Sequence, residues 1–357
     1  MDNSYDVEDY RAVDPRYGTM EDFEELVREE VEKVVRFWMT NGDFKTLEDF
    51  RDVESKNNYR ILTEKGLSSS DAMVGEDLEY YKTTSSYKRL FEGGAQVLKV
   101  ESIYPSLTLP AHVTMMTGMY PDRHGVLSNI LLTPGTDPAP WHWEYGPIRC
   151  DTIFRALKQA GETTAAVFWP VTGGNPDIDW LIADNWPYGE GDTLEKAFER
   201  TGSSPEVMEI VARHKHVYEH CQQKHPERDE FGIRCTADIL REMKPDFMLL
   251  HPANIDAVRH THGIFGPHIS QAVDEFDRWM NLLADALVEA GTFEETNIFL
   301  VSDHGQRNFT RYLSLNAVFA EKGLICLGED GSLKSWRGCW RGCRVVAERP
   351  FSHAIHN

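Results

Sequence analysis

The sequence predicts an α/β protein with a mostly parallel central sheet and helices on both of its faces. Two observations support this fold class. From about residue 67 onward, short apolar runs alternate with segments of helical spacing, and such alternation is typical of α/β layers. One apolar run, "NIFLVSDHG", ends in polar side chains, and open α/β sheets bind ligands beyond the carboxyl ends of their strands.

The individual elements follow in a regular order along the chain. "AQVLKVESIYP" (95–105) is expected to form a strand. "DTIFRALKQAG" (151–161) is expected to form a helix that ends at its glycine, and "TTAAVFWPV" (163–171) the next strand. The same criteria predict three later elements, namely strands at 245–254 and 297–305 and a long helix near Ser270 to Ala290 between them.

Residues 1–66 differ from the rest of the chain. The stretch "EDFEELVREEVEKVVRFWM" has six apolar residues at helical spacing, which predicts one apolar helix face. These residues are Phe23, Val27, Val31, Val34, Val35 and Trp38. We find no chemistry in this part. We therefore expect an N-terminal helical segment at 1–66 and the α/β domain at 67–357.

Composition and charge narrow the possible partners. The formal net charge is -21, which argues against a nucleic-acid scaffold because a phosphate backbone requires a basic surface. It leaves a small phosphate ester possible, since bound metal ions can supply local positive charge. No apolar run has transmembrane length, and the start "MDNSYDVEDYR" is acidic and polar. We therefore expect a cytoplasmic chain without a membrane partner, with its six scattered cysteines as free thiols.

The clearest candidate site is "NIFLVSDHGQ", where Asp303 and His304 follow an apolar run directly. Both side chains are of types that bind zinc-like ions. Consecutive strand residues point to opposite faces. Both therefore serve one site only if the strand breaks there, and Gly305 permits such a break. The alternative is an ordinary surface turn.

A second candidate is "NIDAVRHTHGIFGP", in which Asp256 and His260 are four residues apart. On a helical turn these two side chains share one face. His262 lies close by, and the glycines and proline that follow indicate irregular backbone. The segment predicts a metal-binding loop, and the alternative is a solvated histidine-rich loop.

The third candidate is Thr108 in "YPSLTLPAHVTMMTGMYPDRHGVLSN". Pro110 disfavours helix at the residue before it, so we expect a helix that begins after Pro110 and ends at Gly118. A hydroxyl at that helix start lies near unpaired backbone N–H groups and can help to hold an anion. Taken alone, Thr108 is more simply a turn residue. The same stretch also contains two rival hydroxyls and two histidines that are possible ligands or bases, namely Ser106, Thr117, His112 and His124.

Along the chain the Thr108 stretch comes first, the Asp256–His260 segment second and the Asp303–His304 turn third. In that order the three motifs resemble the nucleotide pyrophosphatase/phosphodiesterase family of the alkaline phosphatase superfamily, over roughly residues 71–325. The resemblance implies that Thr108 is the nucleophile and also contacts one metal. It matches Asn129 to the family's phosphate-binding asparagine. The other matched residues are metal ligands, with Asp256 and His260 for one zinc and Asp71, Asp303 and His304 for the other.

The chain also departs from this family in three places. Ala111 stands where the family usually has Asn, and Asp71 is preceded by "TEKGLSSS" rather than by an apolar strand. The family takes one more histidine ligand from a region well after the Asp-His-Gly motif, whereas this chain continues as "SLKSWRGCWRGCRVVAERPFSHAIHN". We therefore expect a catalytic domain at 67–357 that is truncated or altered at its C-terminal end. Only His353 and His356 remain there as candidates for the missing ligand.

The resemblance implies a hydrolase of phosphodiester or nucleotide pyrophosphate bonds, with two divalent ions, zinc by preference, and a covalent threonine intermediate. Phosphomonoesters and phosphonates are alternative substrates within the same superfamily. A sulfatase would use a modified Cys or Ser, and Thr108 argues against that activity. The contrasting alternative is a non-catalytic remnant that binds metal. Oligomeric state is left open.

Overall fold

A computed structural model of the chain describes residues 67–69, 73–97, 102–131, 140–187, 191–221, 224–306, 325–327 and 333–336. The helix expected at 21–39 and the candidate ligand Asp71 lie outside these residues. Contacts divide the chain into two units, one formed by residues 59–309 and the other by residues 1–58 with 310–357. The three motifs lie in the first unit. In the second, β6 (Ile325–Leu327) pairs antiparallel with β7 (Leu333–Trp336).

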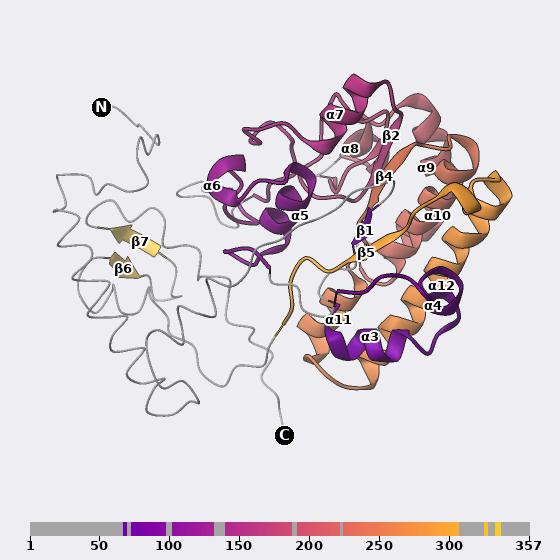
Figure 1. Cartoon of the computed structure of the whole chain (residues 1–357). Helices are drawn as coiled ribbons and strands as arrows, with labels where there is room; N and C mark the ends of the chain where they lie inside the picture. Colours follow the sequence, from indigo (N-terminus) through magenta and orange to yellow (C-terminus); the bar gives the residue numbers. More distant parts are fainter. Residues whose placement is uncertain are drawn as a thin grey trace. The chain divides into compact units, whose positions relative to one another are not determined.

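The first unit is built on a five-stranded sheet in the order β3-β2-β4-β1-β5 (Figure 1). Every pairing among these strands is parallel. The strands are β1 (Leu67–Ser69), β2 (Thr164–Val167), β3 (Trp180–Ile182), β4 (Phe247–Leu250) and β5 (Phe299–Val301). All five carboxyl ends therefore lie at one edge of the sheet, which is where a ligand site is expected in this class.

The sheet is buried on both faces. Along β2, Ala165 and Val167 belong to one apolar core and Ala166 to the other. Along β4, Leu250 lies in the first core and Leu249 in the second. This alternation follows from the two-residue period of a strand, and it explains why these segments are apolar throughout rather than alternating with polar residues.

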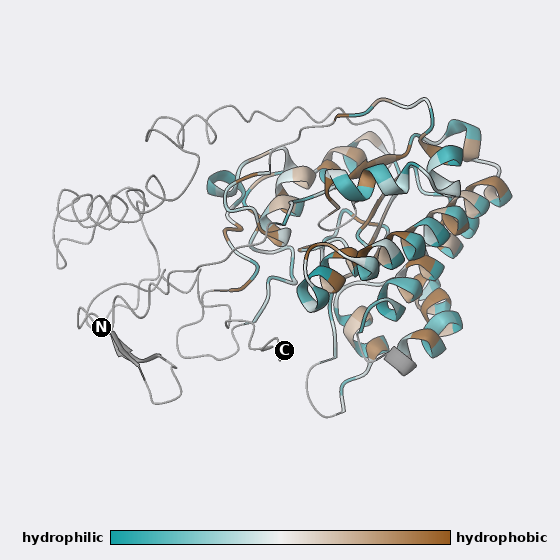
Figure 2. Ribbon diagram, turned by 90° about the horizontal axis from the view of Figure 1, so that it is seen from below, coloured by the Kyte–Doolittle hydropathy of each residue, from teal (hydrophilic) through white to brown (hydrophobic). Residues whose placement is uncertain are grey.

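Helices cover both faces. Figure 1 shows α9, α10 and α12 on one side of the strands and α5 and α6 on the other. In Figure 2 the long helices carry both hydrophilic and hydrophobic residues, as amphipathic helices do. On the first face are α3 (Gly75–Tyr81), α4 (Ser85–Leu90), α8 (Leu194–Arg200), α9 (Pro205–Cys221), α10 (Glu227–Glu242), α11 (Asn254–His262) and α12 (Pro267–Ala290), and on the second are α5 (Thr108–Thr117), α6 (Pro121–His124) and α7 (Ile153–Ala160). The predicted fold class is confirmed.

The structure corrects two sequence-based expectations about strands. The run 95–105 is not a strand in its described part, at 95–97 and 102–105. Of its described apolar residues, Val97 and Tyr104 are 76% and 88% exposed, whereas Ile103 is buried. Conversely, β1 forms within "TEKGLSSS", a segment that lacks the apolar pattern from which a strand would be predicted. It pairs with β4 and β5 on its two sides, so backbone hydrogen bonds secure a strand that side-chain patterning does not reveal.

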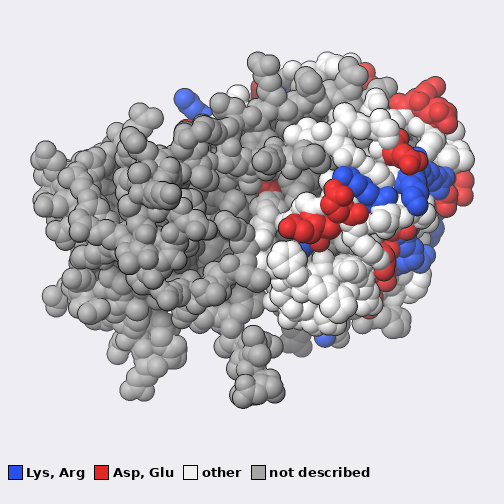
Figure 3. Space-filling view, turned by 60° about the horizontal axis from the view of Figure 1, so that its bottom comes forward, with Lys and Arg blue, Asp and Glu red and all other residues white. Residues whose placement is uncertain are grey.

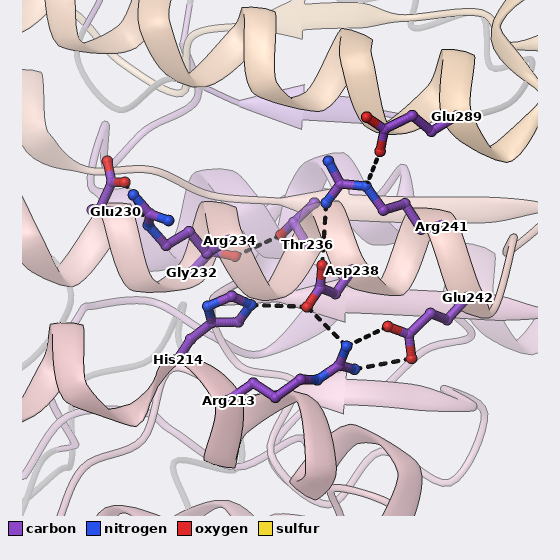
Figure 4. A network of polar contacts seen from close by, with 10 residues as sticks. All are labelled: Arg213, His214, Glu230, Gly232, Arg234, Thr236, Asp238, Arg241, Glu242 and Glu289. Carbon is purple, nitrogen blue, oxygen red and sulfur yellow. Dashed lines mark hydrogen bonds and ion pairs between the residues drawn. The ribbon is translucent and has the colours of Figure 1, made fainter.

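The surface of this unit carries closely paired charges. On the face in Figure 3, acidic and basic side chains lie next to each other. Figure 4 shows one such network joining α9, α10 and α12, in which Asp238 contacts His214 at 2.8 Å and Arg241 at 3.1 Å. Arg241 also reaches Glu289 of α12 at 2.5 Å. We interpret this network as a cross-link between helices. No described helix is long and apolar enough to span a bilayer.

Candidate active site

Helix α5 begins at Thr108, two residues before Pro110. The expectation that the helix starts after Pro110 is therefore wrong. Pro110 occupies the first turn, where its missing N–H has no helical acceptor to serve and where proline is tolerated. Leu107 is extended, and Gly118 ends the helix with φ 67°, as expected. Thr108 thus lies on the first turn of the helix, at the positive end of its dipole.

Two contacts define the surroundings of Thr108. Its Oγ1 lies 3.1 Å from Nε2 of His304. Asn129, which is 7% exposed, accepts a hydrogen bond at Oδ1 from the backbone N–H of Leu109 at 2.9 Å. The N-terminus of α5 therefore meets both the turn after β5 and the asparagine that the resemblance matches to phosphate binding.

The turn after β5 brings Asp303 and His304 to one place. Oδ2 of Asp303 lies 3.4 Å from Nε2 of His304, and Asp303 is buried. Two serine hydroxyls hold the turn, because Ser102 donates to the Asp303 carbonyl at 2.6 Å and Ser302 donates to the His304 carbonyl at 2.9 Å. Gly305 has no positive φ, and a Cβ there would meet only Val74, at 3.7 Å. The break in the strand therefore does not depend on glycine.

Asp256 and His260 lie on α11 and share one face, as their spacing predicts. Oδ2 of Asp256 is 3.3 Å from Nε2 of His260, whose side chain is 47% exposed. Gln306, two residues after His304, donates from Nε2 to Oδ1 of Asp256. This bond connects the α11 pair with the turn after β5. His262 does not join them, since its ring stacks on that of His268 with centroids 4.1 Å apart.

The rival residues around Thr108 have other roles. Ser106 is exposed, and Thr117 donates to the Val113 carbonyl at 2.7 Å within the helix. His124 contacts Thr114 Oγ1 at 3.0 Å through Nε2 and accepts from the backbone N–H of Val126 through Nδ1. Burial lowers the pKa of His124 to about 4. His124 therefore joins α5 to the α6 turn as a neutral, structural histidine.

The site thus consists of two groups in the described residues. One contains Thr108, Asn129, Asp303 and His304, and the other contains Asp256 and His260, linked by Gln306. Carboxylate, imidazole and hydroxyl donors fit zinc-type ions in kind. In number they fall short within the described part of the chain, where no three His, Cys, Asp or Glu side chains converge on one point. Asp71, which follows β1 by two residues, lies outside that part.

Sequence reasoning gave no role to Gln306 or Ser102. Gln306 follows the Asp-His-Gly motif directly, and its polar side chain there is a sign that could have been used. Ser102 carries no comparable sign, because it reaches Asp303 across 201 residues of sequence.

Comparison with known proteins supports the resemblance. The model of the type I phosphodiesterase / nucleotide pyrophosphatase family matches residues 69–354. The match runs well past residue 325, so the expectation that the resemblance ends there is wrong, and His353 falls inside the matched region. A second model, the alpha amylase catalytic domain, matches only residues 1–45, which lie outside the described residues.

Individual relatives are distant. The chain is 26% identical over 235 residues to ectonucleotide pyrophosphatase/phosphodiesterase family member 1 of Mus musculus, covering 62% of this chain and 22% of that protein. It is 24% identical over 242 residues to ectonucleotide pyrophosphatase/phosphodiesterase 1 of Saccharomyces cerevisiae, covering 61% of this chain and 30% of that one. The chain therefore spans less than a third of the length of these relatives.

The fold also matches that of a solved structure. Phosphonoacetate hydrolase from Sinorhizobium meliloti 1021 aligns with a TM-score of 0.50 at 20% identity, over 73% of this chain and 62% of that chain. At this identity the likeness concerns the fold alone. The family match covers far more than half of the sequence and includes all three motifs. The chain belongs to the type I phosphodiesterase / nucleotide pyrophosphatase family.

Proposed function

We propose that this chain is a metal-dependent hydrolase of phosphodiester or nucleotide pyrophosphate bonds that uses Thr108 as its nucleophile. The observation that carries the proposal is the position of Thr108. Its hydroxyl lies on the first turn of α5 and 3.1 Å from His304 of the motif after β5. Family membership supports the class of reaction, and the geometry supports the choice of hydroxyl.

Asn129 and the start of α5 would bind the phosphoryl group. Because Oδ1 of Asn129 accepts from Leu109, the Nδ2 donors of the same amide remain for a non-bridging phosphoryl oxygen. The positive end of the α5 dipole favours the same negative charge. Donors fixed in advance at the position where charge is concentrated stabilise the transition state.

Two sets of residues would hold the metal ions. Asp303, His304, Thr108 and Asp71 would form one set, and Asp256 and His260 the beginning of the other. When bound, zinc ions lower the pKa of coordinated hydroxyl groups and neutralise phosphoryl charge. The strongly acidic chain needs such local positive charge to accept an anionic substrate.

The chemistry of the chain itself is then a double displacement. Thr108 Oγ1 attacks phosphorus, a Thr–O–P bond forms, and the bond from phosphorus to the leaving alcohol or phosphate breaks. The leaving oxygen takes up a proton as it departs. Water then attacks the same phosphorus, the Thr–O–P bond breaks, and the Thr108 hydroxyl is restored. A hydroxyl is a weak nucleophile unless it is activated, which is why its contact with the metal-ligand turn matters.

An assay on aryl phosphodiesters, aryl phosphomonoesters and phosphonates tests the proposal. We expect the diester to be hydrolysed fastest in the presence of zinc, and chelation to stop the reaction. Thr108→Ala should abolish this hydrolysis. Thr117→Ala serves as its matched control, since it removes a hydroxyl from the same helix away from the site. Hydrolysis of none of the three substrates by the zinc-loaded chain would contradict the proposal and favour a non-catalytic, metal-binding remnant.

A further inference from the structure

His112 lies directly beneath Thr108, one helical turn further along α5, and it is fully buried. Its neighbours on the helix, Leu109 and Val113, belong to the apolar core on this face of the sheet. Its ring meets Trp169 edge-on at 4.7 Å and lies 4.2 Å from the ring of His251. An apolar side chain of similar size would fill this space at lower desolvation cost, so packing alone does not explain an imidazole.

The polar contacts of His112 explain it better. Nδ1 lies 2.7 Å from the Thr108 carbonyl and 3.6 Å from Oδ2 of Asp303. The Thr108 carbonyl already accepts a backbone hydrogen bond within the helix, so it does not require the imidazole. One ring nitrogen is therefore directed at both the nucleophile turn and the carboxylate of the motif after β5.

These contacts form a closed cycle of four residues from two separate elements. His112 contacts Thr108 and Asp303, the Thr108 hydroxyl contacts His304, and His304 contacts Asp303 at 3.4 Å. This cycle of contacts fixes the distance between the start of α5 and the turn after β5, because a shift of either element breaks two contacts at once.

The contacts of His112 also define its tautomer. The nearest partner of Nδ1 is a carbonyl oxygen, which only accepts, and this places the proton on Nδ1. His251 lies directly after β4, with its own Nδ1 3.3 Å from the Phe168 carbonyl. The imidazole of His251, which packs against His112, is therefore held in place by the sheet.

We propose that His112 is a positioning residue, which orients the Asp303 carboxylate toward the Thr108 hydroxyl so that both face the same ion and phosphoryl group. This inference rests on the proposed function. Groups that hold a metal ligand from behind typically change metal affinity or activity by about 10–100-fold when removed. A purely structural histidine would change only the stability of the fold.

His124 offers a matched control. Both histidines are buried, His112 within α5 and His124 against it, but His124 bonds to Thr114 and Val126 rather than to the site. We compare His112→Leu with His124→Leu in the full chain. His112→Asn retains a donor close to the position of Nδ1, whereas the longer amide of His112→Gln extends past it.

Calorimetric titration with zinc alone and melting of the metal-free protein test the proposal. We expect similar losses of melting temperature in the two Leu variants without metal, but a zinc affinity about tenfold or more lower only in His112→Leu. His112→Asn should bind zinc within about threefold of the parent and more tightly than His112→Gln. Where a Leu variant fails to fold, the Asn and Gln pair decides. In diester hydrolysis, kcat should fall more than KM changes.

Zinc binding in His112→Leu as tight as in His124→Leu, or equal affinities in the Asn and Gln variants, would overturn the role of His112. If the parent remains zinc-dependent and loses turnover on Thr108→Ala, that result leaves the proposed function intact. A parent that binds no zinc would overturn both.

Discussion

The Thr108 hydroxyl lies 3.1 Å from Nε2 of His304, although 196 residues separate them in the sequence. The contact exists because α5 starts beside the turn that follows β5, at the carboxyl edge of a parallel sheet. The helix start offers the positive end of its dipole to an anion, and the turn offers a carboxylate and an imidazole. The contact of the imidazole with the Thr108 hydroxyl is the structural basis of the proposed reaction.

Replacing Asp303 or His304 with Ala should lower zinc content and the zinc-dependent melting temperature together. Bound metal stabilises only the folded state, so loss of a ligand removes both. His268→Ala is the matched control, since His268 is exposed and lies outside both groups. Metal analysis and calorimetry check this. Unchanged zinc content in both site variants would refute their assignment as ligands.

Asn129→Ala should lower kcat for diester hydrolysis by about 10²–10³-fold, the usual effect of removing one fixed donor to a developing charge. Stability should fall by about 1–3 kcal/mol, because the buried N–H of Leu109 loses its acceptor. Steady-state kinetics and urea unfolding measure the two effects separately. Turnover equal to that of the parent, in a folded variant, would remove Asn129 from the site.

The two zinc sites should differ in affinity. In the described residues, Asp256 and His260 supply only two donors, and a catalytic zinc usually has three protein ligands. We expect one tight and one weaker site. Calorimetric titration of the parent with zinc decides. Two sites of equal, tight affinity would contradict this expectation.

The contribution of Glu230 to stability should decrease as the pH falls into the acidic range. Burial raises the pKa of Glu230, but hydrogen bonds from Arg278 and Trp279 outweigh it, so the net pKa lies below its ordinary value of 4.5. A carboxyl whose pKa is lowered by folding stabilises the protein above its unfolded pKa, and that contribution is lost as pH falls through the folded value. Glu230→Gln should therefore cost more stability at pH 6 than at pH 3.

Urea unfolding at the two pH values measures this difference, with Glu294→Gln as an exposed control. An equal cost of Glu230→Gln at both pH values would show that the ion pairs of Glu230 do not carry the effect.

Much of the candidate site could be proposed from sequence because its residues lie in recognisable positions of regular elements. Asp303 and His304 follow an apolar strand, and Asp256 and His260 have helical spacing. The start of α5 was mispredicted because we expected the residue before Pro110 to be non-helical. Proline is tolerated in the first turn of a helix, so the helix starts before it. Strand β1 was missed because only backbone pairing defines it. The contacts of Ser102, Gln306 and His112 depend on tertiary approach, which one sequence does not encode as a pattern.

The central claim is that Thr108 bonds covalently to phosphorus during turnover. Acid quenching of the zinc-loaded chain during diester hydrolysis, followed by mass spectrometry of the peptide that contains Thr108, tests this most directly. We predict a phosphoryl or nucleotidyl adduct on Thr108 in the parent and in Thr117→Ala, and neither adduct nor turnover in Thr108→Ala. Turnover of Thr108→Ala within about tenfold of the parent, with no adduct on Thr108 in the parent or in Thr117→Ala, would contradict the account.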